Sequence, residues 1–424
     1  ASEWKTLSEG TCTDADTLEY TLTENDRGQY IKFSLTPKNA GESGEKVFKI
    51  VGPVTSSTVR PAANDVKIGG QVVLAQDLAG AAVGGLAEAS YTYTHEYGVA
   101  EDTTKTKYQW YKSATPNGQL IPIEGEIGKT YQVKPEDKSS YLKVSVTPVA
   151  SDGIEGDEVI TEGLQVKWKL SFYDEFEYEA KNGYDPKFNE KWESDRGVRP
   201  LSGINQIRIP DNVEVTDGKL KIHTRREHLD TLGDGSSTAD LDAKMPGPHT
   251  FTTGNIWNRE DIGPEGYYEA SYKYAYTVGF NQSFWAMTRS KPNSPKDDPN
   301  GPYFVELDFN EGHFPRRMAT NIHCFDANGS KKTYSIKHYP IGNHDVNNIE
   351  TPNFGTDFNK FGGYFEQRDM SVAWDEGVNA DNYRAYSNDT EIRRTRGTYL
   401  EAAPLRIWCS IAVYPSFAGG TESM

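Results

Sequence analysis

Alternation of apolar and polar residues is the dominant pattern along this chain of 424 residues. Between residues 303 and 313, Val305, Leu307 and Phe309 alternate with polar residues, which is the period-two pattern of a β-strand with one face in the core. Four more stretches alternate in the same way: residues 255–259, 280–287, 321–325 and 407–414. No long stretch has the spacing of an amphipathic helix. The pattern therefore predicts an all-β fold with very little helix.

The polar sides of these strands carry aromatic, amide and histidine side chains, while their other sides are apolar and are expected in the core. Pyranose rings stack on flat aromatic side chains, and amides and carboxylates hydrogen-bond sugar hydroxyls. Such a sheet face suits a polysaccharide. The residues expected to contact it are Trp257, Arg259, Asn281, Trp285, His323, Trp408 and Tyr414. Core packing remains open as the alternative for each tryptophan, and we expect no metal at this histidine.

Three acids lie on the strand at residues 303–313. Strict alternation places Glu306 and Asp308 on its polar face but would drive Glu311 into the core. An unpaired buried carboxylate costs several kcal/mol or becomes protonated. One extra residue, a β-bulge near Phe309 and Asn310, would return the third acid to the polar face. The alternative is that the strand ends at Phe309 and the third acid lies in a turn.

With the bulge, the two glutamates flank Asp308 on one face of a single strand. Their carboxyl groups could then approach the separation of ~5–5.5 Å found in retaining glycosidases. The like charge of the aspartate would help to hold one glutamate protonated. The three acids are therefore the best candidates for catalysis.

Several segments resemble motifs of glycoside hydrolase family 16. Residues 306–311 read Glu-Leu-Asp-Phe-Asn-Glu and are similar to the family's Glu-Ile-Asp-x-x-Glu signature. Further matches follow the family's order over residues 169–424: Asp174-Glu175-Phe176, Trp192, residues 251–254, residues 266–273, Phe284-Trp285 and residues 321–323. Members include laminarinases, lichenases, agarases, porphyranases, carrageenases and xyloglucan-active enzymes. The resemblance implies a concanavalin-like β-jelly-roll sandwich.

The resemblance also implies roles for the acids in a retaining endo-β-glycosidase. Glu306 would be the nucleophile, Glu311 the general acid and then base, and Asp308 the residue that orients the pair. Asn310 departs from the family, which more often has an apolar residue there. The implied substrate is a β-galactan such as agar, porphyran or carrageenan, or a β-1,3-glucan. No cofactor is expected, and a structural calcium ion is left open.

A non-enzymatic reading competes with this one. Val-Glu-Leu-Asp at residues 305–308 also resembles the metal-binding strand of legume-type lectins. Glu306, Asp308 and His323 would then be ligands of manganese and calcium. Such a lectin has no need of Glu311. A hydrolase that has lost activity and only binds polysaccharide is a third reading.

Residues 20–37 and 131–148 are copies of one another, each with tyrosines and a proline at the same spacing. Their period of about 111 residues fits one immunoglobulin-like sandwich. The second copy has roughly 50 residues before its Trp110 that the first lacks before Trp4. We therefore expect a partial immunoglobulin-like repeat at 1–55, a complete one at 56–168 and the jelly-roll domain at 169–424. Spacer is the favoured role of the repeats, and carbohydrate binding is the alternative.

The net charge of −17 argues against nucleic acid and gives no general attraction to sulfated polymers. Two arginine clusters, Arg316-Arg317 and residues 393–396, leave sulfated galactans as candidate substrates, although the simpler interpretation is that these arginines pair with surface acids. The segments at 291–302 and 339–363 are expected to wall the cleft. The apolar runs are far too short to span a membrane.

Three cysteines do not make a disulfide scaffold, and Cys324 and Cys409 are expected to be core-facing and free, with Cys12 in the N-terminal region. The repeats resemble those of bacterial cell-surface and secreted polysaccharide-degrading proteins. We therefore expect a secreted or cell-surface bacterial protein, acting as a monomer. The start at Ala1 without a signal peptide and the stop after a glycine-rich loop suggest a mature or trimmed fragment.

Overall fold

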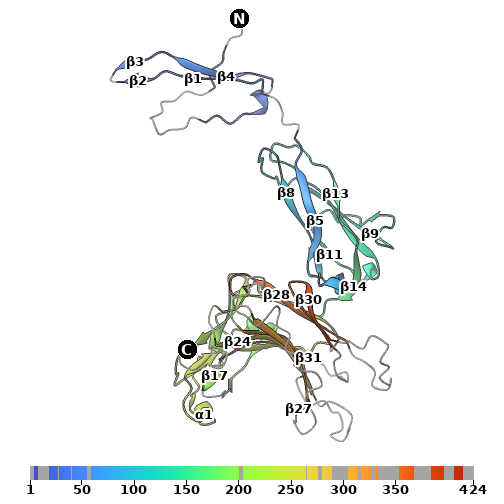
Figure 1. Cartoon of the computed structure of the whole chain (residues 1–424), viewed down its shortest axis with the longest axis vertical. Coiled ribbons are helices and arrows are strands. Elements are labelled where there is room, and N and C mark those ends of the chain that lie inside the picture. Colours follow the sequence, from blue (N-terminus) through green and yellow to red (C-terminus); the bar gives the residue numbers. More distant parts are fainter. Residues whose placement is uncertain are drawn as a thin grey trace.

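The computed structural model describes residues 4–7, 19–26, 28–39, 41–54, 59–199, 204–263, 265–275, 279–288, 304–313, 317–325, 331–332, 353–366, 383–395 and 405–413. In these residues the regular structure is β-strand (Figure 1), apart from the short helix α1 (Ala239–Asp242) and a few 3-10 turns. The predicted all-β fold class is confirmed. No helix in the described ranges is long and apolar enough to cross a membrane.

An immunoglobulin-like sandwich precedes the larger domain. Its core is built around Trp110, which is fully buried and lies 5.5 Å, centroid to centroid, from Tyr131. One sheet has the order β11-β8-β5 and the other β10-β9-β12-β14-β7-β6, with β13 paired to β12. The bounds of these strands are β5 (Ala62–Gly70), β6 (Val72–Val73), β7 (Gly80–Val83), β8 (Leu86–Thr94), β9 (Lys107–Ser113), β10 (Ile121–Pro122), β11 (Thr130–Gln132), β12 (Tyr141–Thr147), β13 (Val159–Ile160) and β14 (Leu164–Lys169).

The internal repeat is visible in a local hydrogen-bond motif. In the second copy the Asp137 carboxylate accepts the Tyr131 hydroxyl at 2.5 Å and the backbone N–H of Lys134 at 2.9 Å. In the first copy Asp26 accepts the Tyr20 hydroxyl at 3.0 Å and the backbone N–H of Thr23 at 2.7 Å, in each case 111 positions earlier. The same acid therefore closes the same turn in both copies.

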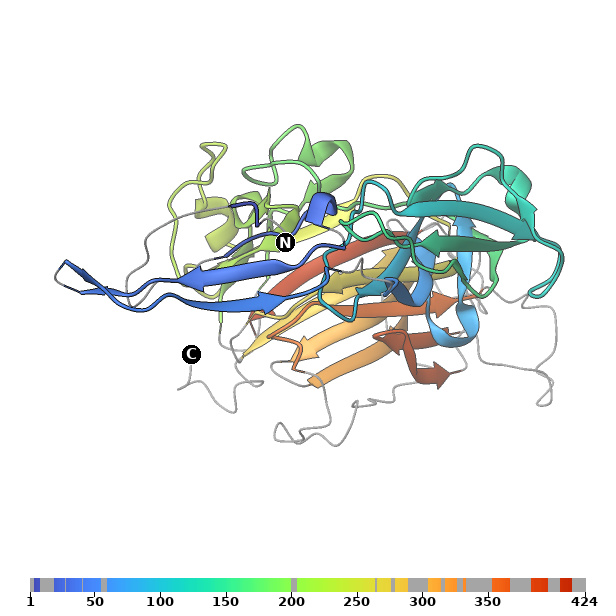
Figure 2. The same ribbon diagram turned by 90° about the horizontal axis from the view of Figure 1, so that it is seen from above.

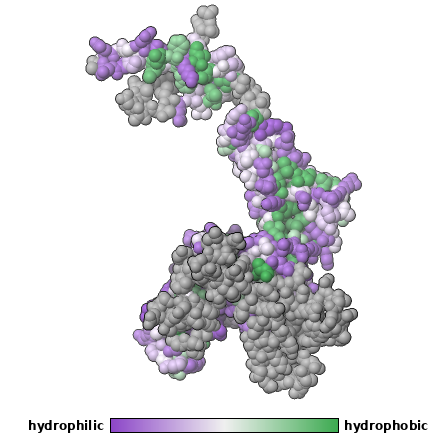
Figure 3. All heavy atoms as spheres, viewed as in Figure 1, coloured by the Kyte–Doolittle hydropathy of each residue, from purple (hydrophilic) through white to green (hydrophobic). Residues whose placement is uncertain are grey.

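Within its described residues, the strands of the first copy are a ribbon of β1 (Ile31–Leu35) and β4 (Val47–Val51), with the short pair β2 (Lys38–Asn39) and β3 (Glu42–Ser43) at its tip. Hydrophobic side chains gather on its surface in Figure 3. Leu35 and Phe48 are exposed there, whereas the equivalents of β1 in the second copy, on β12, are buried against β5 and β8. The ribbon therefore corresponds to part of a sandwich. The domain boundaries given above remain predictions.

Two sheets form the larger sandwich. The sheet that carries the three acids, here called the acid sheet, has the order β15-β22-β31-β24-β25-β26-β27, and its yellow-to-orange strands lie side by side in Figure 2. The facing back sheet has the order β23-β28-β29-β30. The acid-sheet strands are β15 (Trp192–Ser194), β22 (Asn255–Asn258), β24 (Phe280–Thr288), β25 (Phe304–His313), β26 (Arg317–Phe325), β27 (Lys331–Lys332) and β31 (Leu405–Val413). The back-sheet strands are β23 (Gly266–Tyr272), β28 (Asn359–Phe365), β29 (Tyr383–Ser387) and β30 (Thr390–Thr395).

The core between these sheets includes Phe284, Leu307, Phe309, Ile322 and Phe361. Phe284, Leu307, Phe309 and Ile322 are apolar positions of the alternating strands, so the assignment of core faces from the sequence is confirmed for these residues, whereas Phe361 comes from the back sheet. A four-stranded sheet of order β16-β17-β21-β20 and the β18–β19 hairpin flank the sandwich. Their strands are β16 (Gly197–Val198), β17 (Gln206–Arg208), β18 (Val213–Thr216), β19 (Lys219–Ile222), β20 (Thr224–Arg225) and β21 (Phe251–Thr253). Cys409 packs against two core clusters and is free, as predicted.

The immunoglobulin-like domain is docked on the outer face of the back sheet. Ala75, Leu78 and Tyr386 form a buried cluster there, with Trp168 and Tyr364 packed against it. The turn at Gln76 makes two further contacts with the β29–β30 hairpin: its N–H donates to the Asp389 carbonyl at 2.9 Å, and its side-chain oxygen accepts the N–H of Glu391 at 2.9 Å. Apolar burial and these two hydrogen bonds therefore hold the two domains together, while the spacer role of the repeats stays a prediction.

Candidate active site

The three acids lie on β25, which pairs with β24 on one side and β26 on the other. Against β24 the register places Trp285 opposite Asp308 and Phe284 opposite Asn310. Phe309 is therefore an inserted residue that has no opposite residue on β24. Against β26, the register shifts in the same interval. The predicted bulge at Phe309 and Asn310 is therefore confirmed. The alternative, that the strand ends at Phe309, is wrong, because β25 continues to His313.

All three carboxyl groups are on one face of the acid sheet. Residues directly opposite one another on paired strands share a face, and Asp308 lies opposite Asn321. The Asn321 amide donates a hydrogen bond to Oε2 of Glu311, which puts the third acid on that face. Glu306 lies two residues from Asp308 and opposite His323, and ligand atoms of these three residues lie within 4.8 Å of one another.

Different partners hold the individual acids. Nε2 of His323 lies 3.0 Å from Oδ2 of Asp308. Glu311 accepts two amide hydrogen bonds, from Asn321 and, at 3.1 Å, from Nδ2 of Asn281. Both asparagines are buried, so the orientation of the Glu311 carboxyl group is fixed from two neighbouring strands. Asn281 and His323 thus lie where the sequence predicted, whereas Asn321 was expected on this face without a stated role.

The reverse side of the bulge faces the core. Phe309 stacks on Tyr268 at 5.0 Å between ring centroids, and a Cβ added to Gly363 would come within 2.0 Å of its ring. Asn310 is fully buried, with its amide oxygen accepting the Tyr274 hydroxyl at 2.9 Å and its amide nitrogen donating to the Tyr272 hydroxyl.

A third tyrosine holds the acidic strand through its backbone. The hydroxyl of Tyr383, on β29, donates to the backbone carbonyl of Asp308 at 2.9 Å. Sequence reasoning did not identify this tyrosine or the two that contact Asn310. Alternation around Lys273 is the signal that could have placed Tyr272 and Tyr274 on one side of their segment.

Three tryptophans form a row across β22, β31 and β24. Trp408 lies 4.6 Å from Trp257 and 4.9 Å from Trp285, measured between ring centroids. Because β31 runs between the other two strands, the two neighbours cover opposite sides of the Trp408 ring. A sugar ring would therefore stack on the outer faces of Trp257 and Trp285, and Trp408 would support them.

An ion-pair cluster lies at one end of this row. Glu193 accepts the indole N–H of Trp257 at 2.8 Å and lies 3.6 Å from Arg406 and 3.8 Å from Arg259. Arg406 is 2% exposed and also donates to Asp261 at 2.8 Å. Arg259 is exposed and is the cation of this cluster that a ligand can reach. Sequence reasoning identified Arg259 and missed Glu193 and Arg406.

The remaining predicted residues are only partly described. Tyr414, Cys12, Arg316 and Arg396 lie outside the described residues, as do the segments 291–302 and 339–352. Residues 359–363 belong to β28 of the back sheet, so this end of the expected cleft wall at 339–363 does not lie on the acid sheet. For Arg317 and Cys324 the backbone is described in β26 but the side chains are not. Arg393 and Arg394 belong to β30 of the back sheet, so this pair is not on the acid sheet.

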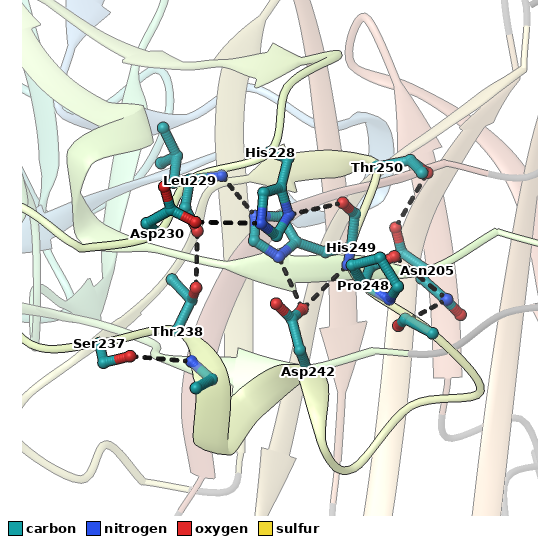
Figure 4. A network of polar contacts seen from close by, with 12 residues as sticks. Asn205, His228, Leu229, Asp230, Ser237, Thr238, Asp242, Pro248, His249 and Thr250 are labelled. Atoms are coloured by element: carbon teal, nitrogen blue, oxygen red, sulfur yellow. Dashed lines mark hydrogen bonds and ion pairs between the residues drawn. The ribbon is translucent and has the colours of Figure 1, made fainter.

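A second cluster of polar side chains, His228, Asp242 and His249, lies around helix α1 (Figure 4). Nδ1 of the buried His249 lies 2.8 Å from Asp242, and its Nε2 accepts the backbone N–H of Leu229 at 3.0 Å. This pattern fits a neutral imidazole that carries its proton on Nδ1 and has no free lone pair. We therefore interpret the cluster as a structural hydrogen-bond network.

Comparison with known proteins finds one matching family model, one curated relative and several similar solved structures. Residues 78–162 match the family model of the AIR9 A9 domain, an immunoglobulin-type family, which agrees with the predicted immunoglobulin-like repeat. Within the curated proteins, 55 residues are 38% identical to the 187-kDa microtubule-associated protein AIR9 of Arabidopsis thaliana. That match covers 13% of this chain and spans only 3% of the length of the plant protein.

The solved structures similar to this chain include glucanases and agarases, the kinds of enzyme that the motif resemblance names. BuGH16Bwt is 18% identical, with 61% of this chain and 85% of that one covered and a TM-score of 0.42. An endo-β-1,3-glucanase from Pyrococcus furiosus is 19% identical, with 58% and 84% covered and a TM-score of 0.39. β-Agarase B from Zobellia galactanivorans is 16% identical, with 59% and 82% covered and a TM-score of 0.39.

Proposed function

We propose that the chain is a retaining endo-β-glycosidase whose catalytic residues are Glu306, Asp308 and Glu311. The observation that carries this proposal is the bulge at Phe309 and Asn310, since it returns Glu311 to the face that bears the other two acids. Two glutamates on one strand with an aspartate between them are suited to double displacement at an anomeric carbon.

In the first step Glu311 donates its proton to the glycosidic oxygen while a carboxylate oxygen of Glu306 attacks the anomeric carbon. The bond between that carbon and the leaving sugar breaks, and a glycosyl-enzyme ester forms. In the second step the Glu311 carboxylate takes a proton from water, whose oxygen attacks the anomeric carbon and releases Glu306. Asp308, held by His323, orients the pair and adds the negative charge that favours a protonated neighbour.

The proposed substrate is a β-linked polysaccharide, either a β-1,3-glucan or a β-galactan such as agar, porphyran or carrageenan. Trp257 and Trp285 supply its stacking surfaces, while Asn281, His323 and Arg259 face its hydroxyl groups. No cofactor takes part. We propose further that the protein is bacterial, acts as a monomer, and works at the cell surface or after secretion.

Azide rescue tests the two glutamate roles separately. The wild-type protein is first screened on a polysaccharide panel, and an activated aryl glycoside of the cleaved sugar is then given to the Glu306→Ala and Glu311→Ala variants. Without the base, azide attacks the glycosyl-enzyme and yields the β-glycosyl azide. Without the nucleophile, azide occupies the vacated space and yields the α-glycosyl azide. Exchanged products would reverse the roles, and full activity of either variant would refute the proposal.

A metal-dependent lectin is the second candidate, because ligand atoms of Glu306, Asp308 and His323 lie within 4.8 Å of one another. The contacts favour the enzyme: the histidine is directed at Asp308, and two buried amides orient Glu311, which a lectin does not need. A chelator separates the two, since loss of sugar binding in EDTA supports the lectin and unchanged hydrolysis in EDTA supports the glycosidase.

A further inference from the structure

We propose that Asn310, together with Tyr272 and Tyr274, is a positioning device that fixes the backbone of Glu311 from the core side of the sandwich. This inference rests on the proposed role of Glu311 as acid and base. The three residues lie on the opposite side of β25 from the carboxyl groups, so they act through Glu311 and do not touch a substrate.

The bulge makes the position of residue 310 unusual. A bulge bends its strand and interrupts the regular ladder, which leaves the local backbone less constrained than in a regular strand. Asn310 directly precedes Glu311 and is fully buried between the two sheets. Its side chain is the link between this irregular stretch and the end of β23.

A buried amide at this position destabilises the folded protein unless its polar atoms are hydrogen-bonded. An unsatisfied buried polar group costs about 1 to 3 kcal/mol, whereas an apolar side chain of similar size packs without any such requirement. Here the amide oxygen and nitrogen each have a tyrosine hydroxyl as partner. An apolar side chain would fill this space equally well. What the amide adds is two directional hydrogen bonds that fix the position of residue 310.

Tyr274 restrains Glu311 from both neighbouring residues. On one side its hydroxyl donates to Asn310 at 2.9 Å. On the other side its ring lies so close to Gly312 that an added Cβ would come within 2.3 Å of Cζ. The same tyrosine therefore limits both peptide units that flank the acid, while Asn281 and Asn321 hold the carboxyl group itself from the front.

The tyrosines keep one protonation state throughout any practical assay. Burial raises the pKa of the Tyr272 and Tyr274 hydroxyls far above the ordinary value, and the hydrogen bond to Asn310 offsets this only in part. Both hydroxyls stay neutral in the assay range. A changed pH profile in a variant of the device therefore reports on the catalytic carboxyl groups.

The test separates positioning from stability by replacing one or all three polar groups. In Asn310→Leu, two tyrosine hydroxyls lose their partner in the core, so the protein should be destabilised and slower. In the triple variant Asn310→Leu, Tyr272→Phe and Tyr274→Phe, no unpaired group remains, so the melting temperature should return towards wild type. Tyr268→Phe is the matched control, since it removes a buried hydroxyl on β23 that donates to the Gly263 carbonyl and leaves Asn310 untouched.

The expected result for the triple variant is near-native stability with kcat reduced between about 10- and 100-fold, as for small misplacements of catalytic groups. KM should change less than kcat, and the basic limb of the pH profile of kcat/KM should move, because that limb reports the acid. A triple variant with wild-type kcat and pH profile would overturn the proposal and leave the device a stabilising role.

A measurement that does not depend on catalysis distinguishes failure of the positioning proposal from failure of the proposed glycosidase function. The ionisation of Glu311 is followed by NMR with ¹³C-carboxyl glutamate, assigned with Glu311→Gln, in the wild-type and triple variants. A displaced carboxyl group should titrate at a different pH in the triple variant. Identical titration of Glu311 in the two proteins overturns the positioning role, even if no polysaccharide is cleaved. If the wild-type protein cleaves no polysaccharide, the proposed glycosidase function is overturned instead.

Discussion

The side chains of His323 and Asp308 meet diagonally across adjacent strands, with Nε2 of the histidine 3.0 Å from Oδ2 of the aspartate. Asp308 is buried at 4% exposure, and removing a partner from a buried ion pair is destabilising because the remaining charge is less well compensated. His323→Leu should therefore lower kcat by about 10- to 100-fold and also lower the melting temperature. His323→Gln, which offers an amide donor near the position of Nε2, should keep most of both. If the Leu and Gln variants lose kcat and melting temperature equally, the hydrogen bond from His323 to Asp308 does not account for the effect of the histidine.

The tryptophan row predicts different effects for its outer and central members. Trp285→Ala removes a proposed stacking surface and should raise KM about 5- to 10-fold, the equivalent of roughly 1 to 1.4 kcal/mol, with little change in stability. Trp408→Ala removes the ring between Trp257 and Trp285, so it should lower the melting temperature more than Trp285→Ala does. Steady-state kinetics and thermal unfolding check the two effects. A purely structural row would give stability losses without the rise in KM.

The sequence predicted the acid sheet well because alternation, burial and charge act on the same few residues there. A carboxylate cannot be buried cheaply, so the position of Glu311 five residues after Glu306 already required a bulge. Residues such as Asn281 and His323 then followed from the same period of two. The structure brings them into contact with Glu311 and Asp308.

Contacts made across the sandwich could not be predicted in the same way. Alternation of apolar and polar residues predicts which face of its own strand Tyr383 occupies. It does not predict that the Tyr383 hydroxyl reaches the backbone carbonyl of Asp308, 75 residues earlier. The Glu193–Arg406 pair is likewise set by how β15 and β31 flank β22, which is a matter of topology. The docking of Leu78 on Tyr386 depends on two domains meeting, and a pattern within one strand carries no information on it.

The interface between the immunoglobulin-like domain and the back sheet should be necessary for cooperative unfolding. Leu78 is 7% exposed in this interface, so Leu78→Asp places a charge among apolar side chains and should separate the two domains. Scanning calorimetry should show one transition for wild type and two for the variant. Ile127→Asp, at an exposed position of the same domain, is the control and should leave a single transition. Two transitions in wild type would contradict the prediction.

The His249–Asp242 pair should make the stability of the protein depend on acid pH. Burial alone would raise the pKa of Asp242, but hydrogen bonds from the His249 side chain and backbone outweigh it, and the net pKa is lowered. A carboxyl group with a lowered folded-state pKa stabilises the protein above its unfolded pKa of about 3.9, and this stability is lost as the pH falls through the folded value. Asp242→Asn should therefore cost about 1 to 2 kcal/mol at pH 7, and the difference from wild type should shrink below about pH 4. Urea unfolding across this pH range measures the difference, with Asp240→Asn, an exposed acid of the same helix, as control. A constant difference down to the lowest pH would mean that the charge of Asp242 is not what stabilises this network.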